Sequence, residues 1–471
     1  MKSTAHRFKA QAREALHDDT LQQALGHAKS GFVDKRAAAV AELPDFERLR
    51  DRGQLIKDHA LRNLDYYIAQ FADNVEAQGG TVHWTSTPEE ARETILGLCR
   101  DAGARQVIKA KTMAGEEIGI NETLEREMET VESDLGEYII QLAKEPPSHI
   151  IAPAVHKTRA EITRLFDEHH HHVDGGRLRE APELVAEARQ VLREKFLDAD
   201  VGISGANFLV AETGSVVLVT NEGNADLSTN LPPTHIVIAG VEKIVPGLRD
   251  ASSMLRLLAR SATGQDMTAY TTFLTGARRA EDLDGPENYH VVLIDNGRTR
   301  MLGNEFREML RCIRCGACLN HCPVYSAIGG HAYGWVYPGP MGSVLTPMFI
   351  GLDGARDLPN ACTLNGRCGS VCPVKIPLPD LLRRLRDYQF EQHLTTRTTR
   401  MGLRVWGWVS RHPRLYHLGT RLATAMLRFA GRGSASRLPL AGGWTAARDL
   451  PLPTGSTFQQ QWKARGKERR P

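Results

Sequence analysis

The chain has 471 residues, of which 41% are hydrophobic and 24% charged, and its formal net charge is +3. These values are ordinary for a folded globular protein, and they argue against a fibrous, low-complexity or disordered chain. No apolar run reaches the roughly eighteen residues that a membrane-spanning helix needs, and the N-terminus is charged where a signal peptide has an apolar core. We therefore expect a cytoplasmic protein.

Charge is distributed unevenly along the chain. Residues 377–471 contain 18 Lys or Arg and only 5 Asp or Glu, so the remainder of the chain is acidic. A basic C-terminal region suggests a negatively charged partner, either the acidic face of another subunit or anionic lipid at a membrane surface. A solvated tail without a partner explains the same composition. We expect no nucleic-acid partner.

Residues 1–64 form the first predicted segment, a helical N-terminal arm. They are rich in Ala, Gln, Leu, Lys and Arg, and Leu21, Ala24 and Leu25 recur at helical spacing. Nothing in this arm resembles a catalytic site.

Residues 65–300 are predicted to form an α/β domain. Short apolar strands alternate with helical patterns, which is typical of a parallel sheet. A helix over 88–100 has Thr87 as its predicted cap, and Cys99 lies in its apolar pattern as a core residue. A helix is also expected over 116–134. Strands are predicted at 81–84, 107–110, 137–141, 149–152, 214–220, 235–239 and 290–295.

Three polar residues of this domain are candidates for a ligand pocket. Lys111, Glu212 and Asn224 each stand next to a predicted strand, and ligands of open α/β sheets lie beyond the carboxyl ends of strands. Lys111 is suited to an anionic ligand. Simple turns explain the same glycine- and asparagine-rich stretches. The four histidines at 169–172 suggest an exposed patch more than a metal site, and no phosphate-binding loop of a nucleotide site is present.

Four cysteines then occur within eleven residues, at Cys312, Cys315, Cys318 and Cys322, with Pro323 next. The spacing C-x2-C-x2-C-x3-C-P is that of bacterial ferredoxins, in which thiolates hold an iron–sulfur cluster and the fourth cysteine serves the other cluster of a pair. Zinc sites more often use two separated C-x2-C pairs, and unligated cysteines seldom occur at this density.

A second group contains Cys362, Cys368 and Cys372, with Asn365 at the place of the fourth cysteine. The cross-over rule assigns Cys312, Cys315, Cys318 and Cys372 to a first cluster, and Cys322, Cys362 and Cys368 to a second. Three thiolates suit a 3Fe–4S cluster, or a 4Fe–4S cluster with one iron open or bound by oxygen. A degenerate second site that serves only as scaffold remains an alternative.

The two groups are separated by a Gly-, Pro- and aromatic-rich segment, so residues 301–385 are predicted to form an expanded, mostly helical ferredoxin-type domain. Residues 386–471 then form a basic C-terminal region with amphipathic helices and a tail. Such helices lie on membrane surfaces, dock on partners or pack on their own chain.

These features together resemble the lactate utilization protein B family. The resemblance rests on both cysteine groups, on 111–121, on 202–207 with 211–216, on Asn221–Asn224 and on 231–235. It implies a LUD domain with an α/β fold like the NagB/RpiA/CoA-transferase group, 4Fe–4S clusters, and partnership with a cysteine-rich subunit and a small LUD subunit. Asn365 departs from the family's second motif.

The resemblance also implies a role in oxidising L-lactate to pyruvate, with this chain passing electrons onward, to quinone for example. A contact with the membrane periphery would accompany that acceptor. The rival hypothesis is that the LUD domain is itself an enzyme that binds an anionic or acyl substrate through Lys111 and Glu212, while the clusters serve structure or redox sensing.

Overall fold

The computed structural model describes residues 3–170, 180–429, 433–436, 449–453 and 455–468. It divides into two compact units, Met1–Tyr388 and Gln389–Pro471. His171 and His172, half of the histidine run, lie outside the described residues. Of the other two, His169 is exposed, whereas His170 is buried and its imidazole lies 2.9 Å from the Tyr138 hydroxyl.

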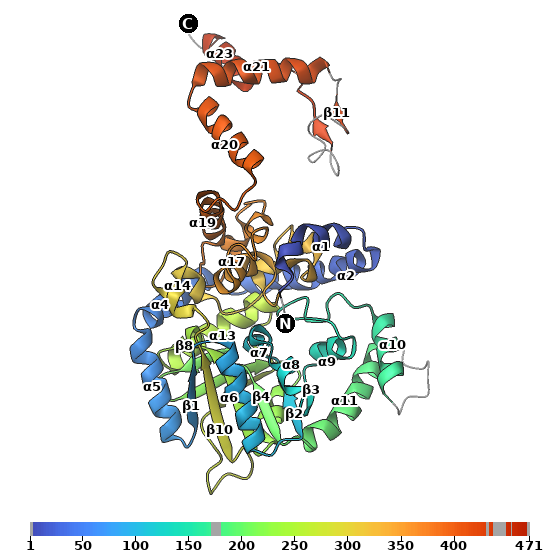
Figure 1. Ribbon diagram of the computed structural model, residues 1–471, viewed down its shortest axis with the longest axis vertical. Helices are drawn as coiled ribbons and strands as arrows, with labels where there is room; N and C mark the ends of the chain where they lie inside the picture. The colour runs from blue at the N-terminus through green and yellow to red at the C-terminus, as the bar shows by residue number, and fades with distance from the viewer. Residues whose placement is uncertain (1–2, 171–179, 430–432, 437–448, 454, 469–471) are drawn as a thin grey trace. The chain divides into compact units, whose positions relative to one another are not determined.

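A six-stranded sheet forms the centre of the first unit (Figure 1). Its order is β1-β10-β7-β4-β2-β3, and every neighbouring pair is parallel. Parallel neighbours need crossover connections, which helices supply here, so the predicted α/β fold is confirmed. The strands are β1 (Thr81–Thr85), β2 (Gln106–Lys109), β3 (Glu129–Glu132), β4 (Val201–Ser204), β7 (Thr234–Gly240) and β10 (Asn288–Ile294).

Alternating side chains of the strands divide the apolar core between the two faces of this sheet. Val291 and Leu293 of β10 pack with helix α5 (Leu64–Ala77). Their neighbours Val292 and Ile294 pack with helix α6 (Pro88–Asp101), as the two-residue period of a strand requires. Cys99 is fully buried in this second core, where burial raises the pKa of its thiol to about 12.

A smaller sheet packs beside the large one. Its order is β8-β5-β6-β9, with β6 antiparallel to both β5 and β9. Its strands are β5 (Phe208–Val210), β6 (Ser215–Thr220), β8 (Ile244–Val245) and β9 (Tyr270–Leu274). The remaining helices of the α/β region are α7 (Met113–Ile118), α8 (Ile120–Leu124), α9 (Leu135–Leu142), α10 (Arg159–His169), α11 (Ala181–Leu197), α12 (Asn224–Asn230), η3 (Val241–Lys243) and α13 (Leu248–Ala262).

Three predicted elements of this region were wrong. Residues 116–134 form parts of α7 and α8 and then β3, not one helix. Residues 137–141 belong to helix α9, whose first turn is capped by the Asp134 carboxylate; a short apolar run does not by itself separate a strand from a buried helix. Residues 149–152 form bends, because the His149 ring accepts hydrogen bonds from the backbone N–H groups of Ile151 and Ala152.

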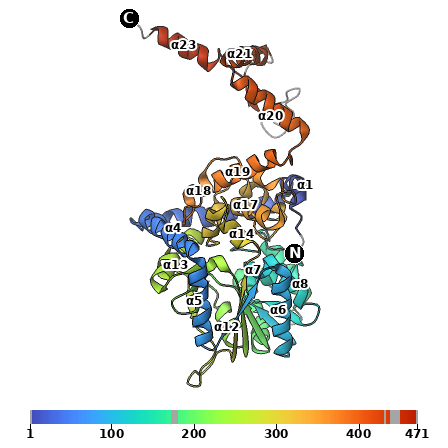
Figure 2. The same ribbon diagram turned by 60° about the vertical axis from the view of Figure 1, so that its left-hand side comes forward.

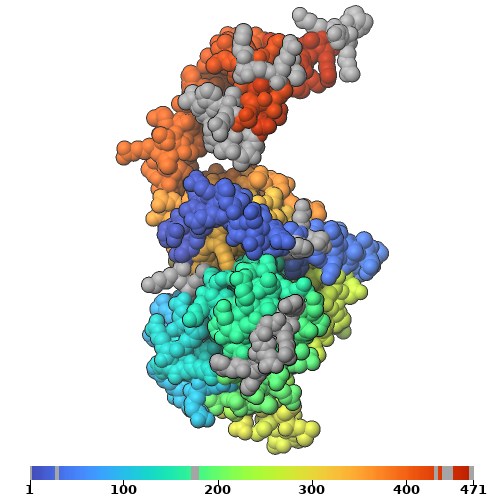
Figure 3. Space-filling model, turned by 90° about the vertical axis from the view of Figure 1, so that its right-hand side faces the viewer, coloured from blue at the N-terminus to red at the C-terminus, as the bar shows by residue number. Residues whose placement is uncertain are grey.

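The N-terminal helices pack on the cysteine-bearing segment. Phe8 of α1 and Phe46 and Leu49 of α4 share one apolar core with Leu319 and Val371. Figure 3 shows these blue helices lying against the gold residues that follow the α/β region. The arm is therefore part of the first unit. Its helices are η1 (Ala5–Arg7), α1 (Phe8–Ala15), α2 (Asp19–Lys29), η2 (Ser30–Asp34), α3 (Lys35–Ala41) and α4 (Phe46–Arg62).

The cysteine-bearing segment consists of short helices, as expected for a mostly helical ferredoxin-type domain. Only two of them exceed ten residues. They are α14 (Arg298–Leu302), η4 (Arg307–Arg311), α15 (Ala317–Asn320), α16 (Tyr325–Ile328), η5 (His331–Tyr333), α17 (Gly339–Ile350), η6 (Leu358–Asn360), α18 (Arg367–Val371) and α19 (Leu378–Glu391).

The second unit contains two amphipathic helices, α20 (Arg397–Ser410) and α21 (Pro413–Phe429), which Figure 2 shows in orange-red. Trp406 and Trp408 of α20 are more than half exposed, and α20 has no buried residue. No helix among the described residues is long and apolar enough to cross a membrane. The other described elements here are β11 (Ser434–Ala435), β12 (Leu450–Pro451) and α23 (Phe458–Glu468).

Candidate iron–sulfur centre and adjoining pocket

Both cysteine groups use the same backbone turn. Arg314 and Gly316 have φ values of 58° and 73° in the first group, and Leu364 and Gly366 have 55° and 81° at the matching places in the second. Left-handed backbone at a non-glycine residue is uncommon, so its repetition at the same site is informative. Asn365 therefore occupies the position of a missing cysteine in a turn that is otherwise preserved.

Cys312, Cys315, Cys318 and Cys372 line one small cavity. The other lining residues are almost all apolar, among them Ile150, Met341 and Val374. Cys372 is 54 positions beyond Cys318 in sequence, and the fold alone brings it to this wall. Four sulfur donors in an apolar cavity match the requirements of a 4Fe–4S cluster, which takes four cysteine thiolates.

Electrostatics around this cavity favour a cationic occupant. Burial, reinforced by the neighbouring thiols of Cys312 and Cys372, raises the pKa values of Cys315 and Cys318. Burial likewise raises the pKa of Cys372 to about 11. Thiols held this close together ionise only when positive charge compensates them, and the iron of a cluster supplies that charge.

Cys322, Cys362 and Cys368 form a second group. Burial, together with Cys362 and Cys322, raises the pKa of Cys368 to about 12, and burial with Cys362 raises that of Cys322. Asn365 is exposed, and its side-chain oxygen accepts a hydrogen bond from the Arg367 backbone N–H at 3.1 Å. The amide oxygen is thus bonded to the backbone at the start of helix α18, and three thiols remain for a second cluster.

Backbone N–H groups and aromatic rings surround the sulfurs. The N–H of Leu364 donates to Cys362 Sγ at 3.2 Å, and the N–H of Ile376 donates to Cys372 Sγ at 3.4 Å. Tyr333 is fully buried, and Cys322 and Cys362 add to the burial that raises its pKa. Hydrogen bonds to sulfur and exclusion of water are the terms by which a protein sets a cluster's potential.

The N-terminal arm contributes two arginines that sequence reasoning missed. The Arg36 guanidinium donates to the Val371 carbonyl at 3.0 Å, and the Arg50 guanidinium donates to the Cys372 carbonyl at 2.7 and 3.1 Å. Both side chains are buried. They hold the end of the second cysteine group in place, and no local sequence signal marks them.

A second, larger cavity lies at the carboxyl edge of the sheet. Lys111 and Asn224 line it, as do Lys243 and Arg314. Ile150 and Arg314 line both this pocket and the four-cysteine cavity, so the two cavities are neighbours. The Lys111 ammonium donates to the Ile151 carbonyl at 2.6 Å, and the Asn224 amide donates to the Ser133 hydroxyl at 3.2 Å.

Glu212, which we expected at the same crevice, does not line this pocket. Its carboxylate accepts a hydrogen bond from the backbone N–H of Leu248 at 3.0 Å, at the first residue of helix α13. A carboxylate at a helix N-terminus satisfies an otherwise unpaired N–H and interacts favourably with the helix dipole. Glu212 is therefore a helix-capping residue in this structure.

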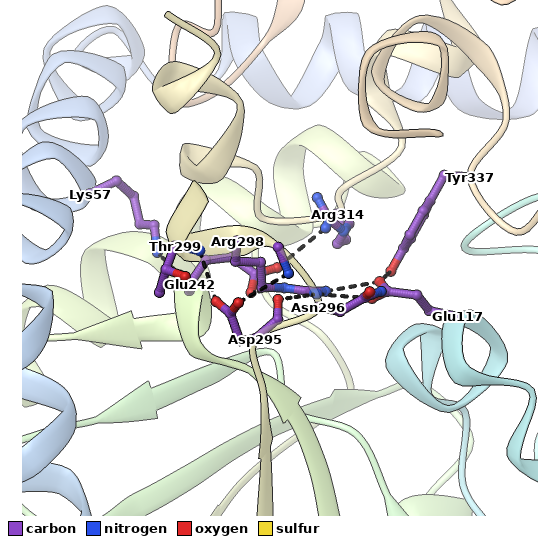
Figure 4. Close-up of polar contacts among 10 residues, drawn as sticks. Lys57, Glu117, Glu242, Asp295, Asn296, Arg298, Thr299, Arg314 and Tyr337 are labelled. Atoms are coloured by element: carbon purple, nitrogen blue, oxygen red, sulfur yellow. Dashed lines mark hydrogen bonds and ion pairs between the residues drawn. The ribbon is translucent and has the colours of Figure 1, made fainter. Parts of the chain in front are cut away.

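A buried ionic network borders the pocket (Figure 4). Arg298 pairs with Glu117 at 2.8 Å and with Glu242 at 2.6 Å. Arg314 approaches Glu242 at 3.3 Å and stacks over the Tyr337 ring, whose hydroxyl donates to Glu117 at 2.6 Å. The network links the α/β region to the cysteine-bearing segment and fixes Arg314 between the two cavities.

Three parts of this chain match known domain families. Residues 68–294 match the LUD domain, 308–376 the 4Fe-4S dicluster domain, and 391–467 the lactate utilisation protein B C-terminal domain. The chain therefore carries an iron–sulfur domain of the 4Fe–4S type.

Full-length relatives point the same way. The chain is 43% identical to lactate utilization protein B of Oceanobacillus iheyensis, over 98% of this chain and 96% of that one. It is equally similar to the Shouchella clausii protein of that name, over 98% and 97% of the two chains. It is 42% identical to the electron transport protein YkgF of Escherichia coli, over 97% and 96%. The chain belongs to the lactate utilization protein B family of LUD-domain iron–sulfur proteins.

Proposed function

We propose that this chain is an electron-transfer subunit of a system that oxidises L-lactate to pyruvate. The observation that carries the proposal is the sorting of seven cysteines into a four-thiol cavity and a three-thiol group. Lactate comes from the names of the relatives, and electron transfer is the chemistry that iron–sulfur clusters supply. The protein's own part is to hold the sulfurs, exclude water and set the potentials.

The ligand sets follow from this arrangement. Cys312, Cys315, Cys318 and Cys372 would hold a 4Fe–4S cluster, and Cys322, Cys362 and Cys368 a second cluster of the 3Fe–4S or 4Fe–4S type. Electron paramagnetic resonance of the anaerobically purified chain tests both sets. We expect a three-iron signal in the oxidised protein and a four-iron signal after dithionite reduction.

Variants connect these signals to function. Cys315→Ala should abolish the four-iron signal and growth on L-lactate, whereas Cys99→Ala, the cysteine outside both groups, should retain both. Normal growth of the Cys315→Ala strain would refute the electron-transfer role. Growth lost in both variants would point to impaired folding, which the iron content of the purified Cys99→Ala protein would reveal.

We also propose a division into an arm (1–64), a LUD domain (65–300), an iron–sulfur domain (301–385) and a docking region (386–471). The docking region would bind the cysteine-rich subunit or the small LUD subunit of the system, and its exposed Trp406 and Trp408 support this. Truncation after Tyr388 should leave both cluster signals intact and abolish co-purification of these subunits. Unchanged co-purification would exclude a docking role.

A second candidate function concerns the pocket. Lys243 lines it, and its ammonium makes no hydrogen bond or ion pair with any residue that the structure describes. Burial, with Arg314 nearby, lowers the pKa of Lys243 to about 8, so the ammonium form still predominates at neutral pH. A half-buried cation without a direct partner among the described residues favours a small anion, and a carboxylate is the simplest one.

Calorimetric titration of the full chain with lactate, pyruvate and coenzyme A tests this candidate. Lys243→Met should raise the dissociation constant of the bound anion at least tenfold, and Lys195→Met, which removes a surface lysine paired with Glu129, should not. If none of the three compounds binds the unaltered chain, the pocket has no role in holding such substrates, and Lys243 serves only to offset the charge of the neighbouring cysteines.

A further inference from the structure

A cluster of Glu145, His156 and His331 lies apart from both cysteine groups and from the pocket. Each residue offers one ligand atom, and these three atoms all lie within 4.8 Å of one another. Glu145 and His156 belong to the segment between α9 and α10, and His331 opens η5. The cluster therefore joins the α/β region to the iron–sulfur segment, across 175 positions of sequence.

Hydrogen bonding fixes the proton on His156. The Ser148 hydroxyl donates to the Pro153 carbonyl at 2.9 Å, because a carbonyl cannot donate. Ser148 has only this one proton, so His156 Nδ1, 2.7 Å away, must donate to the Ser148 oxygen. In the neutral ring Nε2 then carries a lone pair, and it faces the Glu145 carboxylate at 2.8 Å.

The same reasoning fixes the proton on His331. Its Nε2 lies 2.8 Å from the Pro146 carbonyl, which only accepts, so Nε2 donates. The neutral ring therefore presents a lone pair on Nδ1. A histidine that binds a metal through one nitrogen commonly donates the other N–H to a backbone carbonyl or a hydrogen-bonded side chain. Each of the two histidines thus has one ring nitrogen that donates within the protein and one that can bind a metal.

One contact in the cluster brings together two atoms that both act as acceptors when the His156 ring is neutral. Lys157 engages Glu145 Oε1 at 2.5 Å, which leaves Oε2 directed at the His156 lone pair. A carboxylate oxygen and a ring nitrogen 2.8 Å apart need a proton or a metal ion between them, and His331 places a third donor atom within 4.8 Å of both.

We propose that Glu145, His156 and His331 form a binding site for a divalent transition-metal ion, zinc or ferrous iron. Two imidazoles and one carboxylate are the donor set of both ions, which leave further positions to water. A tetrahedral ion with bonds of about 2.1 Å holds its donor atoms about 3.4 Å apart. Side-chain rotation would open the 2.8 Å contact between His156 Nε2 and Glu145 Oε2 slightly and adjust the other separations, which are at most 4.8 Å.

The site would fasten η5 to the α/β region. Tyr333, two residues after His331, lies beside Cys322 and Cys362, so the metal would hold this ring against the second group of cysteines. Ser148 also accepts a hydrogen bond from the Tyr325 hydroxyl at 2.8 Å, which ties the same two regions together. The inference concerns this cluster alone and does not depend on the proposed electron-transfer function.

The test uses the full, cluster-loaded chain after removal of loosely bound metal with a chelator. Equilibrium dialysis against zinc, and separately against ferrous iron under anaerobic conditions, measures stoichiometry. X-ray absorption at the zinc edge then distinguishes nitrogen and oxygen ligands from the sulfur ligands that zinc would find at the cysteines. We expect one additional metal ion per chain, with nitrogen and oxygen ligands only.

Three variants identify the residues. His156→Gln, His331→Gln and the nearly isosteric Glu145→Gln should each raise the dissociation constant at least tenfold. His83→Gln is the matched control, because His83 pairs with His290 at 3.3 Å in a half-buried histidine pair outside the cluster. Iron content and the cluster signals report folding of each variant. No bound metal, sulfur ligation, or equal binding by the three variants would overturn the site.

Discussion

Arg298 and Glu117 form a bidentate ion pair in the interior, although 181 positions separate them in sequence. The two guanidinium nitrogens donate to the two carboxylate oxygens at 2.9 and 2.8 Å, and both side chains are almost fully buried. Removing one partner of such a pair leaves an uncompensated buried charge, which costs about 3–5 kcal/mol. The pair is therefore an energetic link between α7 and α14.

Glu117→Gln should destabilise the protein by several kcal/mol, because Arg298 and Arg314 would then share the single buried carboxylate of Glu242. The urea midpoint of the anaerobic, cluster-loaded protein measures this loss. Glu89→Gln is the control, because Glu89 pairs with Arg92 on the surface at 2.8 Å, where ion pairs contribute at most about 1 kcal/mol. Equal urea midpoints for the two variants would show that the buried ion pair contributes no more to stability than the surface pair does.

Cys372→Ser should remove the four-iron signal of the first cluster, although Cys372 belongs to the second sequence group. Cys362→Ser should instead remove the three-iron signal and spare the first cluster. The reason is that Cys372 lines the cavity of Cys312, Cys315 and Cys318. Paramagnetic resonance of both variants decides the assignment, and an exchange of the two outcomes would reverse the ligand sets.

Asn365→Cys should convert the second site to a four-thiol site. The backbone turn of the first group is already present, and residue 365 occupies the matching position. After reconstitution with iron and sulfide, the three-iron signal should decrease and a second reducible four-iron signal should appear. Asn365→Ser lacks a thiol and should leave the three-iron signal in place. A persistent three-iron signal in Asn365→Cys would show that the side chain cannot reach the cluster.

His235 should make stability depend on pH. It is fully buried in β7, and burial, with His290 nearby, lowers its pKa to about 3. The ordinary pKa of about 6.5 applies in the unfolded chain, so stabilisation is complete above pH 6.5 and is lost progressively toward pH 3. At pH 5 the loss amounts to about 2 kcal/mol.

Urea unfolding at pH 7 and pH 5 measures this effect. His235→Asn keeps a polar group near Ser204, whose hydroxyl lies 2.8 Å from the His235 ring, and should reduce the difference between the two pH values by about 2 kcal/mol. The exposed His17→Asn is the control. An undiminished pH dependence in His235→Asn would mean that other groups cause it.

The iron–sulfur chemistry and the class of the fold can be predicted from the order of the residues alone. The cysteines of each group lie close together in sequence, and the left-handed turns at Arg314 and Leu364 form within a few residues. The spacing of the cysteines therefore predicts how their thiols are arranged. The alternation of apolar strands and helices likewise predicts a parallel sheet, because a parallel pair requires a crossover.

The contacts between distant residues become visible only in the folded chain. It placed Glu212 at the start of α13 and not in the pocket, and it brought Arg50 of the arm to the Cys372 carbonyl. It also assembled Glu145, His156 and His331 from two separate segments. Such contacts depend on how whole helices and strands pack against one another. Packing depends on the apolar surface of the whole chain, so no short stretch of sequence predicts these contacts.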